Sequence, residues 1–318
     1  MVHLRILVPA ASAHAVLASL EACTSVINIV HLAGAARKPP GDVVLCDVAR
    51  EDASVVLADL EQLVDLRTHG SIAIEDVDTS LSAAAEAAEA AASGSPSDAV
   101  VWEEVAAHTS ESATISGGFV VFIVLASLIA AVGIILDSPI LIVGAMVVGP
   151  EFGPVAGVCV ALVQGRPRLA GQSLLALAVG FPLGIGITLL AVLTFKSTGI
   201  VPARFDSASH SLSEVIASPD ALAFFVAFCA GIAGMLSLST AKSGALIGVL
   251  ISVTTIPAAA NVGVAAAYGD WDTSGGSLAQ LGVNLSSMLV AGTLTLAVQR
   301  VQYLRRRRAH RARAARAA

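Results

Sequence analysis

Residues 141–165 read LIVGAMVVGPEFGPVAGVCVALVQG, and Glu151 is the only charged side chain among them. A membrane-spanning helix needs about 20 consecutive apolar residues, since the hydrocarbon layer of a bilayer is about 30 Å thick. This run is long enough to span, but a Gly-Pro pair interrupts it on either side of Glu151. Two prolines remove two backbone donors, so the pattern predicts a membrane helix that breaks near its middle.

The apolar character continues along the chain on both sides of this run. Of the 318 residues, 56% are hydrophobic and 13% are charged, whereas a soluble domain has about 25% charged residues. Most of the aspartates and glutamates lie before residue 112. Six apolar segments are long enough to cross a bilayer. They cover residues 115–136, 139–163, 169–195, 221–240, 243–267 and 278–300.

The first 80 residues have the pattern of a soluble α+β domain. Strands are expected at 3–8, 25–32, 43–49 and 71–77, with helices at 12–23 and about 51–67 and a turn at 39–42. The order βαββαβ predicts a ferredoxin-like fold. The predicted domains are therefore the ferredoxin-like domain at 1–80, a helical linker at 81–113, the transmembrane domain at 114–300 and a basic tail at 301–318. Part of the linker is suited either to the membrane–water interface or to a plain connecting helix.

Basic residues in the loops indicate the orientation in the membrane. The loops after the second, fourth and sixth spans contain Arg166 and Arg168, then Lys242, then the arginine-rich tail that begins at Arg305. The opposite loops are mixed or acidic. Because Lys and Arg concentrate in cytoplasmic loops, we expect a multi-pass protein of the cell membrane with both chain ends in the cytoplasm. A nucleic-acid-binding tail is the less favoured interpretation, and we expect no nucleic-acid partner.

Two of the predicted spans resemble each other. Residues 141–165 align without gaps with residues 245–269, at a spacing of 104 residues. Over about forty positions about eleven are identical, whereas about four would match by chance in a chain so rich in small apolar residues. If a unit of three spans occurs twice, the second copy must enter the membrane from the side opposite to the first. The pattern therefore predicts a 3+3 inverted repeat, as in secondary transporters. The alternative is convergent packing of small residues in two helices.

Glu151 is the candidate functional group of the membrane domain. A carboxylate at mid-depth costs about 2.5–3.5 kcal/mol on insertion scales, so it should face a cavity, a partner or a proton. The alternative is a cap for the helix after the break. The predicted substrate or ion pathway consists of residues from the break, the aligned segment and the sixth span: Gly149, Pro150, Glu151, Gly153, Pro154, Thr254, Thr255, Pro257, Asn261 and Asn284. The two asparagines are also typical of helix–helix contacts.

The chain contains no P-loop, nucleophile elbow, zinc-protease or dinucleotide-binding motif, and its cysteines and histidines have no metal-ligand spacing. We therefore expect no enzyme activity, no cofactor and no metal site. The membrane segments predict a secondary transporter or channel-like permease for a small solute or ion, surrounded by membrane lipid and assembled as a homo-oligomer. The alternative is a membrane-anchored sensor or scaffold whose N-terminal domain binds a regulatory ligand.

The broken span with its continuation RPRLA, the later segment GALIGVLISVTTIPAAANVGVAAAYGDW and the βαββαβ domain resemble a prokaryotic family of "uncharacterised hydrophobic proteins", numbered 389 among domains of unknown function. The resemblance covers about residues 1–300. Many members have a Ser-Pro-Leu-Met-Gly-Pro pattern where this chain has Gly149–Pro154, and adjacent prolines where it has Pro257 and Ala258. An acid at Glu151 would then belong to a subgroup, and the family implies no substrate.

Overall fold

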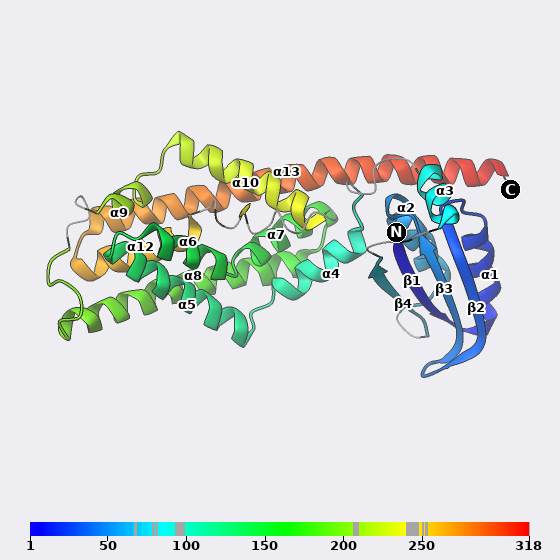
Figure 1. Ribbon diagram of the computed structural model, residues 1–318, viewed down its shortest axis with the longest axis horizontal. Helices are drawn as coiled ribbons and strands as arrows, with labels where there is room; N and C mark the ends of the chain where they lie inside the picture. The colour runs from blue at the N-terminus through cyan, green and yellow to red at the C-terminus, as the bar shows by residue number, and fades with distance from the viewer. Residues whose placement is uncertain are drawn as a thin grey trace. The chain divides into compact units, whose positions relative to one another are not determined.

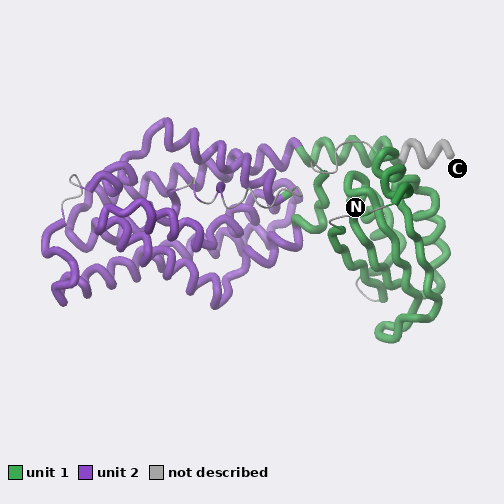
Figure 2. Tube along the Cα trace, viewed as in Figure 1, with its two compact units in different colours: residues 1–105, 239–241, 299–318 green, residues 106–238, 242–298 purple. Residues whose placement is uncertain are grey.

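The computed structural model describes the chain except for residues 67–68, 78–79, 81, 93–98, 206–209, 240–247, 250, 252–253 and 318, and except for the side chains of 311–317. The chain divides into two compact units, which Figure 2 shows in different colours. Unit 1 contains residues 1–105, 239–241 and 299–318, and unit 2 contains residues 106–238 and 242–298.

Unit 1 is built on a four-stranded antiparallel sheet (Figure 1). Its strands are β1 (Val2–Val8), β2 (Val26–Arg37), β3 (Pro40–Val48) and β4 (Ser71–Asp76), in the spatial order β2-β3-β1-β4. Helices α1 (Ala10–Glu21) and α2 (Arg50–Leu63) complete the predicted order βαββαβ, and α3 (Ala83–Ala91) follows. Alternate residues of β1 point to one face of the sheet and are buried against α1 and α2 in a single core.

The turn between β2 and β3 is shorter than predicted. The structure contradicts the expected turn at 39–42, because β3 already begins at Pro40 and pairs there with Arg37. Residues 38–39 alone form the turn. Proline is tolerated as the first residue of a strand, where its missing N–H removes no essential ladder bond.

Unit 2 is helical. Its helices are the last part of α4 (Trp102–Ser112), α5 (Gly117–Ile135), α6 (Pro139–Val148), α7 (Phe152–Gln164), α8 (Pro167–Ser197), α9 (Ser211–Ile216), α10 (Ala221–Ser239), α12 (Thr255–Tyr268) and α13 (Trp271–Ala317) up to residue 298. The remainder of α13 belongs to unit 1. We call residues 106–197 the first half of unit 2 and residues 210–298 the second half.

Four of these helices, α5, α8, α10 and α13, are long and apolar enough to cross a membrane. Helices α6 and α7 form a fifth span if the pair is counted as one, and the angle of 48° between them confirms the predicted break. Several large apolar side chains on these helices are exposed, as expected for a surface that faces lipid. The predicted span at 243–267 lies partly outside the described residues, so the total of six stays a prediction.

The ends of the helices recur at a spacing of 104 residues. Helices α5 and α10 begin 104 residues apart (221 − 117) and end 104 residues apart (239 − 135). The same spacing separates the last residues of α7 and α12 (268 − 164) and the first residues of α8 and α13 (271 − 167). A left-handed glycine terminates both α7 and α12, at Gly165 and Gly269. The spacing therefore extends well beyond the two aligned segments.

Helices α5 and α10, which begin 104 residues apart, run in opposite directions (Figure 1). The loop that follows α5 lies beside the start of the second half, because the Ser211 hydroxyl donates a hydrogen bond to Asp137 Oδ2 at 3.0 Å. At the other end of unit 2, Leu238 near the end of α10 lines the same cavity as Gly118 at the start of α5. Helices α4 and α9, which precede α5 and α10, therefore lie at opposite ends of unit 2.

Candidate functional site

Glu151 lies at the break between α6 and α7, and its side chain is buried, with 4% of the residue exposed. The hydroxyl of Thr255, the first residue of α12, donates a hydrogen bond to Glu151 Oε1 at 2.6 Å. Glu151 Oε2 has no hydrogen-bond partner among the described residues, and no basic side chain described in the structure pairs with it. Glu151 occupies the N-cap position of α7 but makes no side-chain capping bond. The carboxylate therefore accepts a hydrogen bond from α12 and does not cap α7.

Glycines leave the space that this arrangement needs. A Cβ atom on Gly149 would lie 2.3 Å from Glu151 Oε2 and 2.7 Å from Ile256 Cγ1. A Cβ atom on Gly153 would lie 2.7 Å from the Cβ of Ser112 at the end of α4. Without side chains at these two positions, the break can approach α12 on one side and α4 on the other.

We call the place where Glu151 meets Thr255 the junction. Both helices that meet there, α7 and α12, have a buried proline in the first turn. Pro154 lies in the first turn of α7 and Pro257 in the first turn of α12. A proline is tolerated there because the first N–H groups of a helix have no partner within the helix. The two prolines therefore fix where α7 and α12 begin, and their side chains offer no polar group to a solute.

A chain of polar side chains continues from Thr254, the neighbour of Thr255. Thr254 Oγ1 accepts a hydrogen bond from Asn284 Nδ2 at 3.0 Å, and Asn284 Oδ1 accepts one from Gln280 Nε2 at 3.1 Å. Gln280 Oε1 is buried and has no partner among the described residues. Sequence reasoning selected Asn284 but missed Gln280. The spacing i, i+4 of two amides in an apolar helix is the signal that could have found it.

Asn261 belongs to a separate cluster. Its Oδ1 accepts a hydrogen bond from the Ser213 hydroxyl at 2.9 Å, and its Nδ2 donates to Ser277 Oγ at 2.9 Å and to the Ser213 carbonyl at 3.1 Å. These bonds join α12 to α9 and α13. Among the described residues no hydrogen bond connects this cluster to Glu151, so Asn261 holds helices together rather than contributing to the junction.

Two cavities of similar size flank the junction. The first-half cavity, of about 430 Å³, is lined by the end of α4, the start of α5 and the break, including Gly149, Pro150 and Gly153. The second-half cavity, of about 450 Å³, is lined by α9, the start of α10 and residues that include Thr254 and Asn284. Eight lining positions of the first recur 104 residues later in the second. They are 111, 112, 114, 116, 118, 119, 122 and 150, which correspond to 215, 216, 218, 220, 222, 223, 226 and 254.

Helices α5 and α10, whose first residues line the two cavities, are capped in the same way. Ser116 Oγ accepts a hydrogen bond from the backbone N–H of the third residue of α5 at 3.1 Å. Asp220 Oδ1 accepts the corresponding bond from the third residue of α10 at 2.7 Å. Each side chain satisfies an N–H group that the helix itself leaves unpaired. The two helix starts are therefore built alike, with a hydroxyl in the first half and a carboxylate in the second.

Two close helix contacts repeat with the halves exchanged. A Cβ atom on Gly263 in α12 would lie 2.9 Å from the Thr188 Cβ in α8, and a Cβ atom on Gly292 in α13 would lie 3.0 Å from Cys159 Sγ in α7. Gly263 stands 104 residues after Cys159 (263 − 159), and Gly292 stands 104 residues after Thr188 (292 − 188). In a two-fold arrangement, a contact of residue i with residue j is matched by a contact of j with i. These two contacts have that form.

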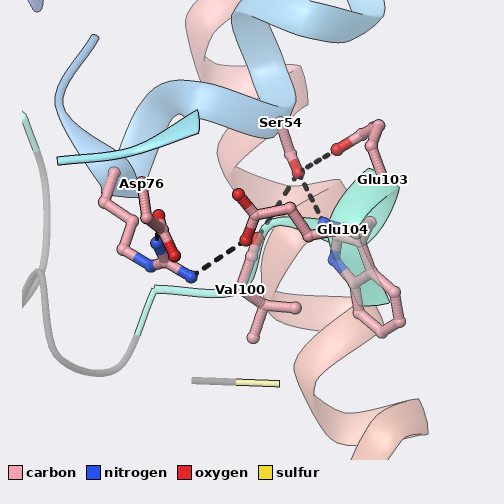
Figure 3. Close-up of polar contacts among 7 residues, drawn as sticks. Ser54, Asp76, Val100, Glu103 and Glu104 are labelled. Atoms are coloured by element: carbon pink, nitrogen blue, oxygen red, sulfur yellow. Dashed lines mark hydrogen bonds and ion pairs between the residues drawn. The ribbon is translucent and has the colours of Figure 1, made fainter. Parts of the chain in front are cut away.

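A second buried polar cluster, not foreseen from the sequence, lies in unit 1 (Figure 3). Ser54 in α2 donates a hydrogen bond to Glu103 Oε2 at 2.6 Å and accepts one from the Trp102 backbone N–H at 2.9 Å. Burial raises the pKa of the Glu103 carboxyl, and the bond from Ser54 lowers it in part. Arg300 stacks over the Trp102 ring, and the Tyr303 hydroxyl donates to the Ser54 carbonyl at 3.3 Å. The cluster therefore ties residues 300–303 of α13 to α2 and α4 within unit 1.

Charged residues beside this cluster form ion pairs. Arg50 pairs with Asp76 and, through Nη2, with Glu104 Oε2 at 3.1 Å.

In the described part of the chain no group of three or more His, Cys, Asp or Glu side chains is arranged to hold a metal ion. Burial raises the pKa of the Cys46 thiol to about 12, which keeps that cysteine protonated in the core of unit 1.

The fold is that of a membrane protein with a broken span, formed by α6 and α7. At the break, the Glu151 carboxylate contacts the first residue of α12. The family model described as Domain of unknown function (DUF389) matches residues 146–290, which include both helices of the junction. This match confirms the predicted resemblance over that range. No curated protein and no solved structure matches the chain. The family description names no activity, so function has to be argued from the site.

Proposed function

We propose that unit 2 is a secondary transporter or channel-like permease for a small solute or ion, with Glu151 as its proton- or cation-linked group. The pathway runs from the first-half cavity, past the Glu151–Thr255 hydrogen bond, to the second-half cavity. The observation that carries this proposal is the pair of corresponding cavities on either side of a buried carboxylate with one unpartnered oxygen.

The positions of Glu151 and Thr255 support a two-fold relation between the halves. They are 104 residues apart (255 − 151), so each is the counterpart of the other, and they are hydrogen-bonded. A residue can contact its own counterpart only close to a two-fold axis. The reciprocal contacts at Gly263 and Gly292 support the same axis. Each half supplies three spans in this interpretation, and such inverted repeats place transporter sites at mid-membrane where helices are broken.

The two cavities lie at opposite ends of unit 2, which suits alternating access. With both chain ends in the cytoplasm, the first-half cavity would open to the cytoplasm and the second-half cavity to the outside. The Glu151–Thr255 bond then separates the two. Binding of a proton or cation at Glu151 Oε2 changes the charge at this barrier. A bound ion can then shift the equilibrium between the two conformations, because its interaction with Glu151 differs between them.

The alternative of a sensor or scaffold, in which the spans only hold subunits together, requires a fully packed and satisfied junction. Glu151 Oε2 and Gln280 Oε1 are buried without partners, and an unsatisfied acceptor costs about 1–3 kcal/mol. A purely structural core would be more stable with apolar residues at both positions. The junction therefore favours a role in binding and transport.

Thiol labelling from the two sides of the membrane tests the proposal. Thr114 and Ser218 line the two cavities at corresponding positions. In the full chain carrying Cys229→Ala, which removes the exposed cysteine, Thr114→Cys should react with an impermeant maleimide from the cytoplasmic side only, and Ser218→Cys from the outer side only. The Cys229→Ala parent is the control for labelling of the buried cysteines. Reaction of both positions from the same side would contradict the proposed pathway.

A further inference from the structure

We infer that the solute of this pathway is a small, hard monovalent cation, the chemistry shared by Na⁺ and K⁺. The inference rests on the proposed function and names the class of substrate for the same site. Its basis is the kind of polar atom that the junction leaves unpartnered, together with the charges that line the two cavities.

The hydrogen-bonded groups at the junction leave acceptors unpartnered. On one side Thr255 satisfies Glu151 Oε1, and Oε2 is free. On the other side Thr254, Asn284 and Gln280 form a chain whose last atom, Gln280 Oε1, is free. Both residues are more than nine-tenths buried, and Gln280 lines the second-half cavity. A carboxylate oxygen and an amide oxygen without partners complement a cation, and the negative charge of the carboxylate repels an anion.

The charges that line the cavities have the same sign. Glu111 lines the first-half cavity, and Glu214 and Asp220 line the second-half cavity. No lysine or arginine occurs among the described residues that line either one. Carboxylates in a cleft with low-dielectric walls raise the local concentration of cations and lower that of anions. Both cavities therefore favour positive charge before a solute reaches Glu151.

The ligand types and the number of charges narrow the class further. The two unpartnered atoms at the junction, Glu151 Oε2 and Gln280 Oε1, are both oxygens, and oxygen ligands suit hard cations rather than transition metals. One carboxylate neutralises one positive charge. A divalent ion would keep a net charge in the apolar interior, and the penalty for a buried unpaired charge is several kcal/mol. A monovalent ion matches Glu151 alone.

Tracer uptake into proteoliposomes of the full chain tests the inference. Radioactive sodium, rubidium (as the K⁺ surrogate), chloride and glycerol are compared under an inside-negative potential against protein-free liposomes. Sodium or rubidium uptake should exceed the protein-free rate at least about tenfold, equivalent to about 1.4 kcal/mol, with chloride and glycerol at the protein-free rate. The matched variant Thr255→Val should lower cation uptake without admitting chloride.

The outcomes separate the substrate class from the proposed function. Uptake of chloride or glycerol in place of the cations would overturn the cation class but leave a permease. Absence of uptake of all four tracers would also overturn the cation class, and the two-sided thiol labelling then decides independently whether the pathway exists. Cation uptake together with labelling of both positions from the same side would retain the substrate class and contradict the route through the two cavities.

Discussion

The variant Glu151→Gln should reduce sodium and rubidium uptake by at least about tenfold and remove its dependence on pH, because a cation would lose its only buried counter-charge and each 1.4 kcal/mol lost is a factor of ten. Glutamine has the size of glutamate and keeps a carbonyl oxygen that can accept the hydrogen bond from Thr255. The helix break should therefore survive the change. Tracer uptake into proteoliposomes at equal protein density measures the effect.

Exposed carboxylates that line the two cavities provide the control for this experiment. Glu111 and Glu214 are exposed, so their charges are screened by salt. Glu111→Gln and Glu214→Gln should change uptake by less than about threefold at low salt, and not at all in high salt. If Glu151→Gln behaved like these two variants, with unchanged pH dependence, Glu151 would not be the coupling group.

Alanine substitutions at two neighbouring glycines of α13, Gly275 and Gly276, should change the free energy of unfolding in opposite directions. A Cβ atom on Gly276 would lie 2.2 Å from the carbonyl oxygen of Ala217, which is backbone and cannot rotate away. Gly276→Ala should therefore separate α13 from the end of α9 and lower the free energy of unfolding of unit 2 by about 1–3 kcal/mol. Thermal unfolding of the purified full chain in detergent measures the loss.

Gly275 is the matched control, because a Cβ atom there meets nothing within 4 Å. Gly275→Ala should raise the free energy of unfolding by up to about 1 kcal/mol, since alanine is the better helix former. Equal destabilisation by both variants would mean that the close approach of α13 to Ala217 does not exist. Equal stabilisation would lead to the same conclusion.

Much of the fold could be predicted because its signals are local. The alternation of Val2, Leu4 and Ile6 marks a strand with one buried face, and the length of the apolar runs marks α5, α8 and α10. The two prolines around Glu151 locate the break without any tertiary information. The limits of the β2–β3 turn were wrong, because proline and glycine can occupy either a turn or the first residues of a strand.

The candidate site could be predicted only where one residue is unusual by itself. Glu151 is conspicuous as a charge in an apolar run, and the repeat placed Thr255 opposite it in the alignment. That the two side chains touch depends on how α7 and α12 pack, which no local pattern contains. The Ser54–Glu103 cluster was missed for the same reason, since its members are distant in sequence, whereas Gln280 was missed although its partner Asn284 is only four residues away.

The central claim, that a solute reaches Glu151 from the cavities, is tested most directly by modification of that carboxyl with dicyclohexylcarbodiimide. This reagent adds to protonated carboxyl groups, and mass spectrometry of the digested full chain measures the rate at Glu151. We expect Glu151 to react in the native protein, and sodium or rubidium at ten times its dissociation constant to slow the reaction about tenfold, whereas choline does not. A Glu151 that reacts only after the protein is denatured, or at the same rate with and without these cations, would contradict the claim.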